Sequence, residues 1–261
     1  MATVASPVPV RTPEGGTTDA PFQPLADCGT GNFAFYHVFF DDFDSALSFT
    51  TGNTYTVTAA GSSTFAATSG DGGLSLFTTG AVSGNAETIQ VVTPSFTANT
   101  SMKKVFFQCR LKLSAPATST MVAGLISTNT TPYTAVVDGI YFKWVGGTGL
   151  TFNHEASSTL TSVTIPSAAY STAIVANTTF DLAFYVNRNG DILAFVDTQL
   201  VGFIPQSNIG TTNGPQNAGA VARITPATMT SAILTPTLSV QTNSAAAVTM
   251  TADFLGSYKE R

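Results

Sequence analysis

The stretch F-D-L-A-F-Y-V-N-R-N-G-D-I-L-A-F-V-D at residues 180–197 carries the strongest local signal in the chain. Two apolar runs flank N-G at 189–190, the pair that type I′ hairpin turns favour because both central residues need positive φ. A two-residue loop places Leu193 opposite Val186, whereas a three-residue loop starting at position 188 places Ile192 on that face. The sequence leaves both registers open. Both faces of the hairpin carry little charge, so we expect both to be covered.

A second stretch, K-V-F-F-Q-C-R-L-K-L at residues 104–113, alternates with a period of two. This pattern predicts a half-buried strand, with Arg110 and Lys112 on its polar side. Similar short runs, separated by Gly, Asn, Ser and Pro, follow from about residue 36, and one of them spans 192–204. We expect roughly twelve to fourteen strands in all. Residues 167–177 and 217–223 can each hold one short helical turn.

Composition excludes several classes of protein. Of the 261 residues 43% are hydrophobic and 10% are charged, against roughly 25% charged in an average globular chain. Disordered chains combine low hydrophobicity with high charge, so disorder is excluded. A net charge of -5 provides no basic cluster for nucleic acid. The abundance of Thr, Val, Phe and Gly favours strands over a helical bundle.

Residues 1–34 differ from the rest because they are rich in proline and glycine. Proline fixes φ and donates no backbone hydrogen bond, so this segment is predicted to be an extended arm. Residues 35–261 would form one large β-domain. The first residues lack the pattern of a signal peptide, and no apolar run is long enough to span a membrane. Cys28 and Cys109 show no metal-site spacing and are predicted to be buried free thiols.

The order of several segments resembles that of concanavalin A-like jelly rolls, which include legume lectins, laminin-G-type domains and relatives of the family-16 glucanases. The hairpin ends in V-D-x-x-L-V at 196–201, as it often does there. F-F-D-D-F-D at 39–44 resembles the opening strand, and M-T-A-D-F-L at 250–255 resembles the closing strand that pairs beside it. The resemblance covers about residues 36–256 and implies an all-β jelly-roll sandwich preceded by the arm.

Glycosidase chemistry of the family-16 type is not expected. Those enzymes need E-x-D-x-x-E on one strand, where period two places all three acids on one face beside the glycosidic bond. Here glutamate occurs only at positions 14, 87, 155 and 260. An acid pair contributed by distant strands remains open, because sequence spacing does not reveal one.

Asp41, Asp42 and Asp44 form the one acidic cluster that suggests a calcium site. Calcium takes six to eight oxygen ligands, usually with two or more carboxylates on a bent loop. Asp42 and Asp44 would share one face of a strand and Asp41 the other. The favoured interpretation is a solvated strand end whose charges discourage edge pairing.

Trp144, with Tyr141 and Phe142 nearby, is the candidate for an aromatic sugar platform, as the lectin resemblance implies. A lone Trp in a β-rich chain is more often part of the core. His37 and His154-Glu155 lack the spacing of a metal site and are assigned structural or surface roles. G-D-G-G at 70–73 lacks the features of a phosphate loop and is predicted to be a turn.

The same segment order also resembles structural proteins of tailed bacteriophages, and this resemblance gives the leading functional hypothesis. It implies a non-enzymatic capsid decoration or cement protein on the outer surface of the virion. Its partner would be the major capsid protein, and it would form a homo-oligomer, with a trimer favoured. No catalytic residue, cofactor, metal, nucleic-acid or membrane partner is expected. The alternative is a carbohydrate-binding or receptor-binding fibre module, with Trp144 or Tyr141 in its site.

Overall fold

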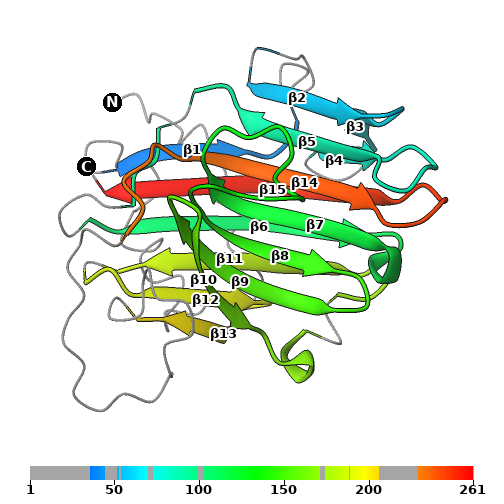
Figure 1. The fold of residues 1–261 in the computed structure, drawn as a ribbon. Helices are drawn as coiled ribbons and strands as arrows, with labels where there is room; N and C mark the ends of the chain where they lie inside the picture. Colours follow the sequence, from blue (N-terminus) through cyan, green and yellow to red (C-terminus); the bar gives the residue numbers. More distant parts are fainter. Residues whose placement is uncertain are drawn as a thin grey trace, which may run out of the picture.

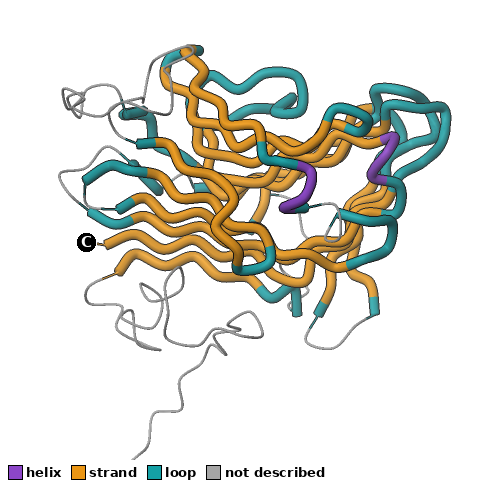
Figure 2. The backbone as a smooth tube through the Cα atoms, turned by 90° about the horizontal axis from the view of Figure 1, so that it is seen from below, coloured by secondary structure: helices purple, strands orange, loops and turns teal. Residues whose placement is uncertain are grey.

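The computed structural model of this protein describes residues 36–44, 52, 54–69, 73–93, 95–98, 103–170, 174–187, 189–205 and 229–260. These residues form fifteen strands in two antiparallel sheets. The sheets lie face to face, and Figure 2 shows the two layers edge-on. The proline-rich segment 1–34, Cys28, and the predicted turns at 70–73 and 217–223 lie wholly or partly outside the described residues.

The sheet that faces the viewer in Figure 1 has seven strands and is called the front sheet. Its strands, in spatial order, are β10 (Thr159–Thr164), β9 (Gly149–Ala156), β8 (Gly139–Val145), β7 (Ser119–Ile126), β14 (Thr235–Thr242), β5 (Ala86–Val91) and β2 (Tyr55–Ala60).

The other sheet has eight strands and is called the back sheet. Seven of them follow in the order β13 (Gln199–Ile204), β12 (Ile192–Val196), β11 (Thr179–Val186), β6 (Val105–Leu113), β15 (Thr249–Glu260), β4 (Leu74–Thr78) and β3 (Thr64–Thr68). The eighth, β1 (Tyr36–Asp41), pairs with the second half of β15. The predicted pairing of the opening and closing strands is therefore confirmed.

Strand β6 begins one residue after the predicted run at 104–113 and ends with it. Its odd-numbered side chains face the other sheet, and all five are at most 1% exposed: Val105, Phe107, Cys109, Leu111 and Leu113. Cys109 is a buried free thiol, as expected, and burial raises its pKa well above the usual value. Phe107 stacks on Phe184 of β11, with 5.2 Å between the ring centroids. The alternation thus builds the middle of a continuous apolar core.

The hairpin at 180–197 adopts the longer of the two proposed loops. Val186 pairs with Ile192, and Asn187 caps the loop by accepting the backbone N–H groups of Asn189 and Asp191 through its Oδ1. Both faces are covered to a large extent. The outward face carries a second apolar cluster, which includes Ala183 and Phe195.

The predicted single run at 192–204 is instead two strands, and this expectation was wrong. β12 ends at Val196 and β13 begins at Gln199, and Val196 pairs directly with Gln199. Asp197 and Thr198 form the two-residue turn, with φ of 45° and 70°. The run lacks glycine at this point, so the sequence carried no ordinary sign of the turn.

The segment 127–138, between β7 and β8, folds back over the outer face of the front sheet. Tyr133 and Val136 pack there against Val122 and Tyr141. Helical structure among the described residues consists of the 3-10 turns η2 (Pro116–Thr118) and η3 (Ser167–Ala169), the latter inside the predicted 167–177 segment. Within the described part of the chain there is no helix long and apolar enough to cross a membrane.

Candidate functional site

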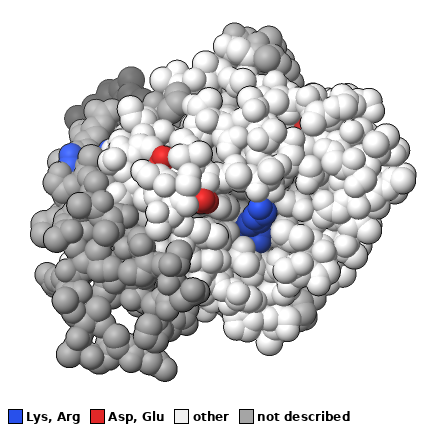
Figure 3. Space-filling model, viewed as in Figure 1, with Lys and Arg blue, Asp and Glu red and all other residues white. Residues whose placement is uncertain are grey.

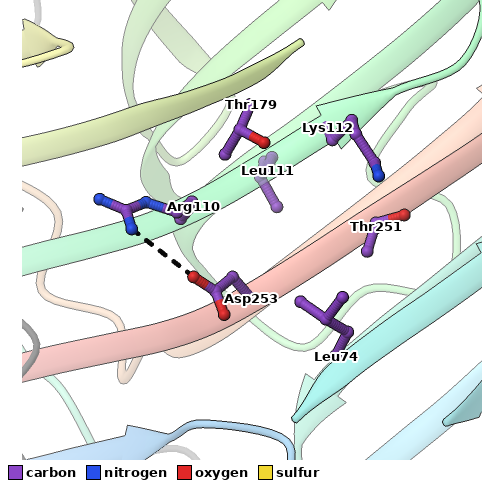
Figure 4. Close-up of a pocket in the computed structure, with 7 residues that line it drawn as sticks. All are labelled: Leu74, Arg110, Leu111, Lys112, Thr179, Thr251 and Asp253. Atoms are coloured by element: carbon purple, nitrogen blue, oxygen red, sulfur yellow. Dashed lines mark ion pairs between the residues drawn. The ribbon is translucent and has the colours of Figure 1, made fainter. Parts of the chain in front are cut away.

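The outer face of the back sheet carries a polar depression that we call the Arg110 pocket. It consists of two adjoining hollows of about 280 and 520 Å³. Both hollows are lined by Arg110 of β6, Thr179 of β11 and Asp253 of β15. Leu74, Leu111, Lys112 and Thr251 complete the smaller hollow, shown in Figure 4. Phe180, Asp181, Asp197 and Thr198 complete the larger one.

Arg110 is the centre of the pocket because strand pairing brings acids to it from both sides. Asp181 lies directly opposite Arg110 in the β11–β6 register. The guanidinium donates two hydrogen bonds to that carboxylate, from Nε to Oδ1 at 2.7 Å and from Nη2 to Oδ2 at 3.1 Å. This two-pronged geometry matches the planar fork of arginine to a carboxylate.

Asp253 reaches Arg110 through a β-bulge. The register of β15 with β6 shifts between Ala252 and Phe254, so Asp253 has no direct partner on β6. Bulges bend a strand and redirect side chains. Its Oδ2 lies 3.6 Å from Nη1 of Arg110, and Figure 4 shows the two groups pointing toward each other between β6 and β15. Phe254, the next residue, places its ring under the guanidinium, 5.6 Å from centroid to Cζ.

Asp197 joins the site from the turn between β12 and β13. Its Oδ1 accepts the backbone N–H of Asp181 at 2.8 Å, and its own N–H donates to the carbonyl oxygen of Asp181 at 3.0 Å. The turn is thereby clamped beside the Arg110–Asp181 pair. Burial raises the pKa of Asp197, and the nearby Asp181 charge adds to the rise, while the backbone hydrogen bond and Arg110 oppose it.

The pocket can therefore both accept and donate hydrogen bonds within a small area. Three carboxylates face one guanidinium, and Lys112 contributes an ammonium group on the same side of β6. The side chains of Arg110 and Asp181 are 24% and 16% exposed, so the central pair is accessible from solvent. Such a mixed polar depression suits a small ligand with many hydroxyl groups better than an apolar ligand.

The sequence placed Arg110 on the polar side of its strand but did not identify this pocket. Asp181, Asp197 and Asp253 come from three segments distant in sequence, and the bulge that redirects Asp253 leaves no local pattern. A weak signal did exist. Charged residues are only 10% of the chain. Acids at outward positions of apolar strands are therefore unusual here, and they indicate a candidate binding surface.

Trp144 lies in the core and provides no sugar platform. It is 8% exposed, donates from Nε1 to the carbonyl oxygen of Pro116 at 2.8 Å, and meets Tyr170 edge to face. Tyr141 is 4% exposed, and its hydroxyl donates to Glu155 at 2.8 Å. The two aromatic residues are thus occupied by structural contacts, as the core interpretation of Trp144 predicted.

Contrary to expectation, Asp42 and Asp44 do not share one face of a strand. β1 ends at Asp41, and Phe43 turns into the core with a φ of 53°. Asp41 is nearly buried rather than solvated, because its carboxylate accepts the Phe43 N–H at 2.8 Å and the Tyr55 hydroxyl at 2.9 Å. Within the described residues, no three His, Cys, Asp or Glu side chains are arranged to hold a metal ion.

The histidines have structural partners. His37 approaches Ser95 Oγ at 2.7 Å through Nε2 and packs against Phe96. His154 is fully buried at the end of β9, and its Nε2 accepts the backbone N–H of Thr230 at 3.3 Å. The adjacent Glu155 faces outward to Tyr141. His154 and Glu155 therefore point to opposite sides of the front sheet and do not form a joint site.

Comparison with known proteins supports the fold. No protein-family model matches the sequence, and the search of curated proteins finds no match. Among solved structures, a protein of unknown function from Shewanella oneidensis MR-1 has a TM-score of 0.52 at 10% identity, covering 87% of each chain. Arcelin-5, a lectin-like defense protein from Phaseolus vulgaris, has a TM-score of 0.51 at 7% identity, covering 87% of this chain and 99% of its own. At such identities the likeness concerns fold alone, and by fold this chain is an all-β, concanavalin A-like jelly-roll sandwich.

Proposed function

We propose that this protein is a non-enzymatic carbohydrate-binding domain, with the Arg110 pocket as its site. The observation that carries this proposal is the cluster of oriented polar groups around Arg110, held in a depression by three neighbouring strands and a turn. The lectin-like fold is consistent with this function but does not by itself assign it.

Saccharide hydroxyls both donate and accept hydrogen bonds. The carboxylates of Asp181, Asp197 and Asp253 accept, whereas Arg110 and Lys112 donate. Hydrogen bonds with a charged partner are stronger than those between neutral groups. The Arg110–Asp181 pair is held by two hydrogen bonds before any ligand arrives, so little side-chain freedom is lost on binding.

Binding fits the pocket better than glycoside hydrolysis. A glycosidase uses one carboxylic acid and one carboxylate on either side of the bond. Here Asp181 and Asp253 are both paired with the same guanidinium. Asp197, whose pKa is raised, holds the turn through its backbone contacts with Asp181. These contacts hold all three carboxylates in one cluster, so none of them stands across a cleft from the others as a separate catalytic acid.

The test is a glycan array with the full chain, followed by calorimetry with the best saccharide. Lys112→Met removes an ammonium group from the pocket, and Lys143→Met is the matched control, because Lys143 is equally half-buried but lies on the outer face of the front sheet. We expect Lys112→Met to weaken binding roughly tenfold or more, the cost of one charge-assisted hydrogen bond. Lys143→Met should bind as the parent does.

Three results would count against the proposal. One is the absence of any saccharide ligand, and another is binding that responds to Lys143→Met but not to Lys112→Met, which would move the site to the front sheet. The third is release of reducing ends from a bound oligosaccharide, which would make the protein a hydrolase.

A capsid decoration or cement protein is the second candidate, favoured by the sparse charge of the front sheet. Figure 3 shows this face as largely uncharged, with only a small group of acidic and basic side chains. Centres of protein interfaces are depleted in charge, so this face suits a broad contact with a shell or with further copies of the chain.

This second proposal places the protein on a virion, bound to the major capsid protein as a homo-oligomer, with a trimer favoured. Mass spectrometry and cryo-EM of purified virions would detect it there, and light scattering after size exclusion would give its stoichiometry. Absence from particles, together with a persistent monomer that binds no shell, would reject this role and leave the carbohydrate proposal standing.

A further inference from the structure

A glutamate lies inside the core at one corner of the sandwich. Glu87 is on β5, where it pairs with Ala59 of β2 on one side and Val240 of β14 on the other. It has the same orientation as Ile89, two residues along, which belongs to the apolar core. The Glu87 side chain is fully buried, with 0% exposure. Its carboxyl group therefore points between the two sheets rather than into solvent.

Neither carboxyl oxygen of Glu87 has a hydrogen-bond partner among the described residues. Asp41 offers a contrast within the same core, because its carboxylate accepts two hydrogen bonds. A buried carboxylate without a partner is far less stable than the neutral acid. The surroundings of Glu87 thus favour the protonated form of its side chain.

Among the described residues, the elements around Glu87 provide no compensating charge. The side chains on the same side of the neighbouring strands are Val57 and the exposed Ala59 on β2, Leu238 and Val240 on β14, Ser75 and Phe77 on β4, and Met250 and Ala252 on β15. The ionisable group described on these faces is Tyr55 of β2, which pairs with Val91 at the other end of β5 and donates its hydroxyl to Asp41.

The corner that holds Glu87 is also where the chain crosses between the sheets. The segment 79–85 leads from β4 to β5, and the segment 243–248 leads from β14 to β15. The two crossings are joined to the strands by backbone bonds, including Thr79 N to the Val248 carbonyl at 3.0 Å and Thr242 N to the Asn85 carbonyl at 3.0 Å. Parting of this corner would bring water to the Glu87 carboxyl.

We propose that Glu87 is a pH-sensitive element whose ionisation above neutral pH loosens the corner formed by β2, β5 and the segments 79–85 and 243–248. Burial raises the pKa of Glu87 to about 7, from 4.5 in its ordinary environment. Because the folded state binds this proton more tightly than the unfolded chain, the contribution of Glu87 to stability is highest below pH 4.5. It declines as the pH rises through 7.

The experiment compares thermal unfolding of the full parent chain, Glu87→Gln and the control Asp44→Asn from pH 4 to pH 9. Asp44 is exposed, so its substitution removes the same charge without touching the core. Between pH 4 and pH 9, the unfolding equilibrium constant of the parent should rise relative to that of Glu87→Gln by on the order of a hundredfold. We therefore expect Glu87→Gln to melt higher than the parent at pH 9, with the difference shrinking toward pH 4. A difference that is equal at pH 4 and pH 9 would overturn the proposal.

Hydrogen exchange locates the effect. At pH 9 the amides of β2 and β5 should exchange faster in the parent than in Glu87→Gln, while those of β8 and β9 should match. Faster exchange spread evenly over both sheets would contradict a local loosening of this corner.

A direct titration keeps the test valid if Glu87→Gln does not fold. The chain has four glutamates, so carbon-13 labelling of glutamate gives a simple carboxyl spectrum. One resonance should titrate near pH 7 and persist in Glu155→Gln, which removes another glutamate of the described strands whose pKa burial raises. If no resonance that persists in Glu155→Gln titrates above pH 6, the proposal is wrong.

Discussion

His154 shows how one buried side chain makes stability depend on pH. Its ring is fully buried, and Nε2 accepts the Thr230 N–H, so Nδ1 must carry the proton in the neutral form. Nδ1 has no hydrogen-bond partner among the described groups. Burial lowers the pKa of His154 from 6.5 to about 4, although Asp138 opposes the change.

The first prediction follows from this depressed pKa. Below pH 6.5 the unfolded chain takes up a proton at His154, whereas the folded protein resists until about pH 4. Stability should therefore fall as the pH drops through this interval, by roughly 3 kcal/mol at completion. His154→Gln can still accept the Thr230 N–H through its amide oxygen and does not titrate. Urea unfolding of both chains from pH 8 to pH 4 should show the parent losing stability relative to His154→Gln. Parallel curves would refute the assignment.

Individual residues were predictable where burial alone decided their role. Cys109 and Trp144 were expected inside, and both lie inside. The pocket residues were not predictable, because their role depends on which strands lie side by side. Asp181 becomes a partner of Arg110 through the β11–β6 register, and Asp253 through a bulge. Glu87 was equally hidden, since a glutamate in a short apolar strand carries no sign of which face it occupies.

Tight turns without glycine are a feature of the strand connections. Asp197-Thr198 joins β12 to β13, and Ser157-Ser158 joins β9 to β10, with positive φ at all four residues. Positive φ suits the right-handed twist of a two-residue hairpin, but it is costly for residues with a Cβ and most costly for β-branched ones. Thr198, at φ 70°, is therefore strained.

The second prediction concerns this turn. Thr198→Gly should stabilise the protein by about 1 kcal/mol, because glycine adopts positive φ freely. Thr164→Gly, in the extended strand β10, is the matched control and should be destabilising. Urea midpoints measured on the two variants check both signs. A loss of stability in Thr198→Gly would mean that the threonine side chain contributes more through its place in the Arg110 pocket than its backbone costs.

Strands were predicted best where they alternate cleanly, and turns were predicted least well. The pattern at 104–113 predicted β6 to within one residue. The Asn-Gly pair marked a real hairpin but left its loop length open, and the side chain of Asn187 caps the longer loop. The break at Asp197 was missed because the turn has no glycine and its second residue, Thr198, is of a type that ordinarily avoids positive φ.

At the scale of the molecule, the fold followed from the order of many weak signals. Alternating runs, an opening strand beside a closing strand, and sparse charge together predicted an all-β sandwich, and the two antiparallel sheets confirm it. No single strand determines what the surface of the sandwich binds. The glycan hypothesis is therefore tested on the whole chain and the capsid hypothesis on the whole particle.

The third prediction concerns the proline-rich segment. The described core is built from residue 39 onward, so deletion of residues 1–33 should leave a folded body. Circular dichroism should show the same β-spectrum and a cooperative melt for the truncated chain. On the capsid hypothesis, co-sedimentation with shells should fall. Loss of cooperative unfolding would show that the segment is part of the core.

The pairing of β1 with β15 also determines how the protein responds to tension. Tyr36 pairs with Glu260, and Asp41 pairs with Leu255, so the outer ends of both strands lie together. A force applied through the two ends of the chain would separate this ladder one hydrogen bond at a time, like a zipper, instead of shearing all its bonds at once. A tethered molecule should therefore yield first at β1, at low force, while the rest of the sandwich is still intact.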